Sequence, residues 1–122
     1  MKLTQETERG VNLVRGYGAG EVRIQNQVLS RPLLVSAQTL IADWPAQDVL
    51  SLTPEQLESI WALLPQVVLL GTGAQQVFPP AEIRRAFTSR GIALEPMDLG
   101  AACRTYNVLV QEDRSVVAAL FP

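Results

Sequence analysis

Histidine is absent from this chain of 122 residues, and cysteine occurs once, at Cys103. Without histidine, the chain has no histidine-based catalytic triad, no histidine general base and no zinc site that needs a histidine ligand. A single cysteine excludes an intramolecular disulfide and a cysteine-cluster metal site, and it fits a reducing compartment. We therefore predict no metal ion and no other cofactor.

Positive charge is also scarce. Ten lysine and arginine residues stand against twelve aspartate and glutamate residues, which gives a formal net charge of −2. Because no excess of positive charge is available to neutralise phosphates, we expect no binding of nucleic acid. The chain has no basic residue between Arg31 and Arg84, where its acidic residues are Asp43, Asp48, Glu55, Glu58 and Glu82. We interpret this stretch as a solvated acidic face rather than a docking surface.

Long hydrophobic runs are missing too. The longest, residues 67–70 and 116–121, are far shorter than the ~20 residues that cross a bilayer, so no membrane span is predicted. Residues 1–9 lack the apolar core of a secretory signal, and they carry acidic residues that mitochondrial transit peptides avoid. We therefore expect a cytoplasmic protein.

What the chain does have is enough apolar surface for one core. Hydrophobic residues make up 48% of the sequence and charged residues 18%, without repeats or a linker. The length is that of one ordinary domain, so residues 1–122 are predicted to form a single domain.

The first third of the chain has the pattern of strands. Strand-like stretches occur at 11–15, 22–25, 28–29 and 33–35, with Val22 and Ile24 alternating with Arg23 and Gln25. The glycine-rich residues 16–20 predict a hairpin turn. An antiparallel meander is expected here.

The rest of the chain alternates helix and strand patterns. A helix is predicted after Thr53 as N-cap, with Leu57, Ile60, Trp61 and Leu64 on its buried stripe. A second helix is predicted from Pro80 to Gly91, with Phe78 packed onto Ile83. The all-apolar residues 67–70 predict a central strand, residues 92–95 and 116–121 two more, and Asp98 the N-cap of a helix to Glu112. This order predicts a three-layer α/β domain.

Gly71, Thr72 and Gly73 directly follow the predicted central strand, where α/β proteins often bind ligands. A nucleotide site is disfavoured because Gln76 stands where a dinucleotide-binding motif has glycine or alanine, and the lysine of a P-loop is missing. A structural tight turn, a contact to a small anion and a contact to a partner's backbone remain as interpretations.

The helix after Asp98 carries the other candidates. At 100° per residue, its core face is formed by Leu99, Ala102, Tyr106, Leu109 and Val110, and its opposite flank by Gly100, Arg104, Asn107 and Gln111. Arg104 and Asn107 project together and could recognise a carboxylate, a phosphate or exposed backbone. The alternative role of Arg104 is a salt bridge or a cap on a neighbouring strand end.

Two further residues have chemistry that a structural role explains as well. Cys103 has no histidine base and lies beyond the first turn of its helix, so we expect a buried and unreactive thiol. Asp98 could act as an acid or base, but N-capping already accounts for it.

The run from Met97 to Leu109, MDLGAACRTYNVL, follows LLGTG at 69–73 and precedes VAAL at 117–120. Together with Gly16-Tyr17-Gly18 and the pair Asp43-Trp44, these motifs make the chain resemble the MTH-domain family, over nearly its whole length. That family includes bacterial and archaeal proteins of unassigned activity, a mitochondrial assembly factor for respiratory complex I and the adipogenesis-associated MTH-domain protein.

The resemblance implies a β+α/β/α fold whose central mixed sheet has one strand antiparallel to the others. It also implies no established catalytic activity and, for at least one branch, protein association during assembly of a membrane enzyme. The family pattern is matched at Gly71, Gly73, Asp98, Cys103, Arg104 and Asn107.

Two functional hypotheses follow. The first is a non-catalytic interaction domain that binds a protein partner, such as subunits or assembly proteins of complex I, near the strand ends and Arg104. The alternative is a small-anion-binding protein or an enzyme that uses a cleft between Gly71–Gly73 and Arg104, with Cys103 or Asp98 acting nearby.

Overall fold

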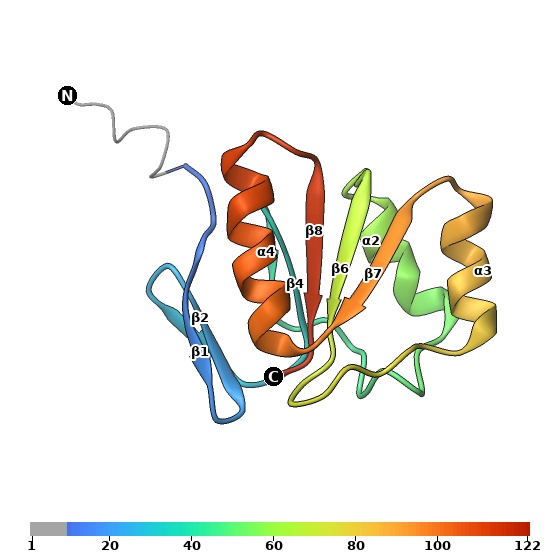
Figure 1. Cartoon of the computed structure of the whole chain (residues 1–122), viewed down its shortest axis with the longest axis horizontal. Coiled ribbons are helices and arrows are strands. Elements are labelled where there is room, and N and C mark those ends of the chain that lie inside the picture. Colours follow the sequence, from blue (N-terminus) through green and yellow to red (C-terminus); the bar gives the residue numbers. More distant parts are fainter. Residues whose placement is uncertain (1–9) are drawn as a thin grey trace.

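The computed structural model describes residues 10–122, so the segment on which the cytoplasmic start was predicted lies outside the described residues. Its strands form two separate sheets, one of three strands and one of five (Figure 1).

The three-stranded sheet is the predicted meander. It consists of β1 (Val14–Gly18), β2 (Glu21–Ile24) and β3 (Gln27–Leu29), each antiparallel to the next. The turn is shorter than predicted, because Gly16 to Gly18 belong to strand β1. Ala19 and Gly20 form the turn with φ values of 40° and 83°, the left-handed backbone that two-residue hairpins require.

The fourth strand of the expected meander belongs instead to the other sheet. Strand β4 (Leu33–Ser36) pairs antiparallel with β5 (Leu40–Ile41) and with β8 (Val116–Leu120). Leu33, Leu34 and Val35 are all buried. Such a run needs cover on both faces, which the five-stranded sheet provides and a surface meander does not.

The five-stranded sheet has the order β5-β4-β8-β6-β7, where β6 is Val67–Gly71 and β7 is Ala93–Met97. Strand β6 runs parallel to both β7 and β8, and β4 is the one strand that runs opposite to the rest. The mixed sheet is thus confirmed. Strand β6 is interior, as predicted, but the middle strand is β8, whose five residues are all buried.

Helices cover both faces of this sheet (Figure 1). One face packs against η1 (Pro54–Leu57), α2 (Glu58–Trp61) and α3 (Ala81–Ser89), in a core that includes Leu57, Ile60 and Phe87. The other face packs against α4 (Leu99–Gln111) and the three-stranded sheet, in a core that includes Val22, Ile24 and Tyr106. The architecture is therefore β+α/β/α.

The predicted first helix is shorter than its apolar stripe suggested. Gln56 Oε1 accepts the Thr53 N–H at 3.0 Å, as expected at a capped helix start. The chain forms one 3₁₀ turn and one α turn, and Leu64 lies outside the stripe, 80% exposed and with φ of 55°. The helix ends at Trp61, and the left-handed backbone at Leu64, next to Pro65, prevents it from continuing.

The other two helices match their predicted ends. Gly91 follows α3 with φ of 70°, and Asp98 caps α4. The packing of Phe78 onto Ile83 stays a prediction, and Phe78 is 59% exposed.

Close packing of α4 on the sheet depends on Gly71, and this can be tested. A Cβ atom at Gly71 would lie 2.9 Å from Leu120 Cδ2 and 3.0 Å from Ala102 Cβ. We expect Gly71→Ala to destabilise the fold by ~1–3 kcal/mol, the usual cost of overpacking a core. Chemical denaturation checks this. The control is Gly16→Ala, whose nearest atom would be 3.7 Å away, and equal losses in the two variants would contradict the packing argument.

Candidate functional site

The turn at Gly71, Thr72 and Gly73 follows β6 and is hydrogen-bonded to the start of α4. The Thr72 N–H donates to Met97 O at 2.9 Å, and Gly73 O accepts the Leu99 N–H at 2.8 Å. Gly71 O accepts the Phe121 N–H at 2.8 Å. These backbone groups hold the ends of β7, β8 and α4 together, so the Thr72 N–H is not free to bind an anion.

The Thr72 side chain is also occupied within the loop. Its hydroxyl accepts the Val77 N–H at 3.0 Å and lies within hydrogen-bonding reach of Gln75 O and Met97 O. Thr72 lines an open hollow of about 490 Å³ whose other walls include Leu50, Val77 and Phe121. Neither glycine of the turn lines this hollow, and Arg104 does not line it either. The hollow is therefore not the expected cleft between the turn and Arg104.

Asp98 caps the helix that carries the remaining candidates. Its Oδ1 accepts the Ala101 N–H at 2.9 Å, which satisfies one of the free N–H groups at the helix start. The capping interaction that the sequence predicted is therefore present.

Part of the α4 flank opposite the predicted core face contacts β1. Asn107 Oδ1 accepts the Val14 N–H and Asn107 Nδ2 donates to Val14 O, both at 2.9 Å. The Tyr106 hydroxyl donates to Asn12 O at 2.8 Å, in the segment just before β1. Asn107 thus acts as a clamp between α4 and the three-stranded sheet, rather than pointing outward beside Arg104.

Arg104 lies at the exposed end of the same contact. Its guanidinium donates from Nη1 to the Tyr17 hydroxyl, and its Cζ atom lies 5.9 Å from the centroid of the Tyr17 ring. Gly100 leaves the room for this ring, because a Cβ there would lie 2.9 Å from Tyr17 Cε1. The predicted residues Arg104 and Asn107 therefore both contact β1, and Tyr17 is the residue that the sequence reasoning missed.

A signal for Tyr17 was present in the sequence. The motif Gly16-Tyr17-Gly18 was noted in the family resemblance, but it was interpreted as part of a turn. What was missing was the pairing of β1 with α4, which joins residues 87 positions apart.

Tyr17 also contributes to the lining of a surface hollow on the three-stranded sheet. The hollow has a volume of about 300 Å³, and its lining residues are Gly16, Tyr17, Gly18, Ala19, Glu21, Arg23 and Val28. Tyr17 is 45% exposed and Val28 58%. Tyr17 pairs with the buried Val22, whereas Arg23 pairs with Gly16 and Val28, so Arg23 and Val28 lie on the face of this sheet that is turned away from α4. We define the Tyr17–Arg104 surface as Tyr17 and Arg104, which offers an aromatic ring and a guanidinium group.

Cys103 faces the opposite way, into the core between α4 and the sheet. It is 1% exposed, as predicted. Burial raises the pKa of its thiol to about 12, although the positive charge of Arg104 acts in the other direction. A thiol in this state is a poor nucleophile.

Within residues 10–122, no three acidic or cysteine side chains cluster as metal ligands would. No helix of this described part is long and apolar enough to cross a membrane. Fold and surface together define a β+α/β/α domain whose N-terminal sheet and last helix jointly present an exposed arginine–tyrosine pair.

Comparison with known proteins names the family. Residues 14–121 match the family described as "Protein of unknown function (DUF498/DUF598)", and the chain belongs to this family. The solution structure of a Mth938-like domain from Bordetella pertussis is similar, with a TM-score of 0.81, 29% identity and coverage of 100% of this chain and 92% of that one. The predicted family resemblance and fold are thereby confirmed.

Two curated relatives have informative names. A "13 kDa major membrane protein" of Francisella tularensis is 32% identical over 117 residues, which cover 95% of each chain. Assembly factor 3 of the NADH dehydrogenase (ubiquinone) 1 alpha subcomplex from Danio rerio is 29% identical, and the match covers 100% of this chain and 71% of the relative.

The clamp at Asn107 predicts a large effect on stability. Asn107→Ala leaves the partly buried Val14 N–H and C=O without hydrogen-bond partners. Leaving such groups unpaired lowers the free energy of unfolding by ~1–3 kcal/mol. Chemical denaturation is the measurement, and Gln111→Ala, an exposed position on the same helix, is the control. A loss no larger than that of the control would show that Asn107 does not hold β1.

The buried thiol predicts slow alkylation. In the folded protein at pH 8, we expect iodoacetamide to label Cys103 at least about a hundredfold more slowly than in denaturant, because thiolate and access are both lacking. Mass spectrometry follows the reaction. An exposed thiol for comparison comes from Gln111→Cys combined with Cys103→Ala. Equal labelling rates in the two folded proteins would contradict the burial argument.

Proposed function

We propose that this protein is a non-catalytic interaction domain that binds a partner protein through the Tyr17–Arg104 surface during assembly of a multi-subunit enzyme. The observation that carries the proposal is the pair itself: Arg104 holds the Tyr17 ring at the surface over Gly100, where a side chain would displace it. Tyrosine and arginine are the residue types that contribute most to binding energy at protein interfaces.

The state of the other candidates supports a binding role over a catalytic one. Cys103 is buried with a raised pKa, Asp98 caps α4, and the Asn107 carboxamide is bonded to Val14. None of the three is left in a position to attack a substrate or to transfer a proton at the surface. Arg104 and Tyr17 offer recognition rather than chemistry.

The charges of the surface indicate the chemistry of the partner. Arg104 is exposed, and it lies beside the half-exposed Tyr17 ring. We propose a partner segment that places a carboxylate on Arg104 and an apolar side chain on the Tyr17 ring. A planar guanidinium group suits carboxylate recognition because it can donate two parallel hydrogen bonds.

The relatives indicate which assembly this is. Because curated relatives are named as assembly factors for NADH dehydrogenase, we propose that the partners are subunits or assembly proteins of respiratory complex I or of an equivalent membrane enzyme. The proposed place of action is the cytoplasmic side, in keeping with the charge and hydropathy of the chain. The relative named as a major membrane protein is compatible with peripheral association through such a partner.

The test separates binding from folding. Arg104→Ala removes an exposed contact worth ~0–1 kcal/mol of stability, whereas losing a forked contact to a partner's carboxylate costs ~2–5 kcal/mol of affinity. We expect this variant to melt within a few degrees of the unmodified protein and to retain at least about tenfold less of the NADH dehydrogenase subunits that a tagged chain captures in its native organism.

Arg114→Ala, an exposed arginine beyond the end of α4, is the matched control and should retain those subunits. Two results would overturn the proposal. One is that Arg104→Ala melts far lower while its folded fraction retains the same subunits. The other is that the unmodified chain retains a small anionic metabolite and no such subunit, which would favour the anion-binding alternative.

A further inference from the structure

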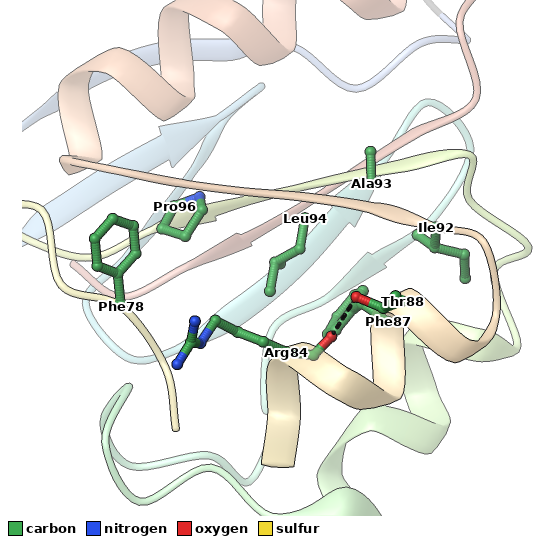
Figure 2. A pocket seen from close by; sticks show the side chains of 8 residues that line it. All are labelled: Phe78, Arg84, Phe87, Thr88, Ile92, Ala93, Leu94 and Pro96. Atoms are coloured by element: carbon green, nitrogen blue, oxygen red, sulfur yellow. Dashed lines mark hydrogen bonds between the residues drawn. The ribbon is translucent and has the colours of Figure 1, made fainter. Parts of the chain in front are cut away.

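A second groove lies at the other end of the molecule, between strand β7 and helix α3 (Figure 2). It has a volume of about 440 Å³. In Figure 1, β7 and α3 stand at the right-hand end, whereas β1 and β2, with the Tyr17–Arg104 surface, stand at the left-hand end. A ligand in this groove would therefore not compete with a partner on the Tyr17–Arg104 surface.

Strand β7 is an edge of the five-stranded sheet, because it pairs with β6 alone. The Ala93 N–H donates to Gln66 O and Met97 O accepts the Thr72 N–H, so these residues turn their backbone groups toward the β6 side. In a parallel ladder alternate residues point to opposite sides, which directs the N–H and C=O of Leu94 and the C=O of Pro96 to the open edge.

The two outward-facing residues differ in availability. Pro96 has no N–H, and its C=O accepts Gln76 Nε2 at 2.9 Å. The proline and the glutamine side chain thus protect the end of the strand, as natural proteins commonly do at sheet edges. The Leu94 N–H and C=O have no such cover from this loop, and they form one backbone docking point near the start of the strand.

The walls of the groove combine an apolar surface with one positive charge. Phe87, Leu94 and Pro96 form its apolar part, and the Phe78 ring, 59% exposed, stands at its end. Figure 2 shows the Arg84 side chain extending along the groove toward Phe78. The Arg84 Nε–H donates to Pro79 O at 3.2 Å, which orients the guanidinium and leaves its terminal nitrogens directed away from that bond.

We propose that this groove binds an extended, acidic segment of a second partner protein, which adds a strand to β7 at Leu94. An apolar side chain of the segment packs on Phe78 and Leu94, and a carboxylate two residues further along contacts the Arg84 guanidinium. Strand addition of this kind takes affinity from main-chain hydrogen bonds and specificity from alternate side chains, which point to one face of an extended chain.

The charge of the groove selects this occupant. Arg84 is the charged residue that lines it, whereas the exposed Glu82 and Arg85 on the same helix and Glu95 on β7 lie outside the lining. A basic segment is therefore repelled, and a purely apolar one leaves Arg84 without a partner. With the Tyr17–Arg104 surface at the opposite end, the protein would hold two partners at once. This inference rests on the proposed role in assembly.

The probe is an acetylated and amidated five-residue peptide in which a leucine and an aspartate stand two residues apart among threonines. The comparison peptide carries lysine in place of the aspartate. Titration into the ¹⁵N-labelled full chain, followed by NMR, is expected to shift the Leu94 amide and its neighbours in β7 and α3. We expect the aspartate peptide to bind at least about tenfold more tightly than the lysine peptide.

Two further measurements identify the contacts. Arg84→Glu should reverse the preference between the two peptides, while the control Arg85→Glu, outside the groove lining, should keep it. The aspartate peptide with every backbone amide methylated retains its side chains but loses its donors, so it should produce no shift at Leu94.

Several results would overturn this inference. They are equal affinity of the two peptides, an effect of Arg85→Glu as large as that of Arg84→Glu, unchanged binding of the methylated peptide, or shifts at Tyr17 and Arg104 instead of Leu94. Dimerisation of the chain that blocks the Leu94 shift would show that a second copy occupies the edge. The proposal for the Tyr17–Arg104 surface stands or falls separately, because its test is the capture of NADH dehydrogenase subunits.

Discussion

The structure depends on one packing constraint: helix α4 lies between two sheets and must fit both. On the side of the large sheet, the absence of a side chain at Gly71 lets Ala102 approach β6 and β8 closely. On the side of the small sheet, Asn107 binds both backbone groups of Val14. Small residues facing one sheet and polar ones facing the other make α4 the support on which the N-terminal strands are held.

This constraint also produces the candidate surface. Because Asn107 fixes β1 along α4, Tyr17 at the far end of β1 meets Arg104 and lies across Gly100. The residues that define the family resemblance therefore have mainly structural roles. Asp98 caps α4, Gly100 makes room for the Tyr17 ring, Cys103 fills the core and Asn107 binds the Val14 backbone. Arg104 is the exception, since its side chain is exposed and can meet a partner while it orients Tyr17.

The two proposed binding surfaces use different physics. The Tyr17–Arg104 surface presents side chains on a finished sheet, whereas the β7 groove offers unpaired backbone at the edge of another. They lie at opposite ends of the long axis of the molecule (Figure 1). A small domain with two such ends would bring two proteins together.

The sequence by itself determined much of the local structure. The α3 and α4 boundaries, the Asp98 cap, the buried Cys103 and the interior strand at 67–71 follow from apolar period, capping residues and glycine, which act over a few neighbours. Only the tertiary structure decided that residues 33–36 leave the meander, that β8 is central, and that β1 covers the flank of α4 bearing Arg104 and Asn107. Helical periodicity shows which side of a helix is less apolar, but a polar side can face water or clamp a strand. The hydrogen bonds that distinguish these outcomes join residues 87 and 93 positions apart, a separation at which no local pattern carries information.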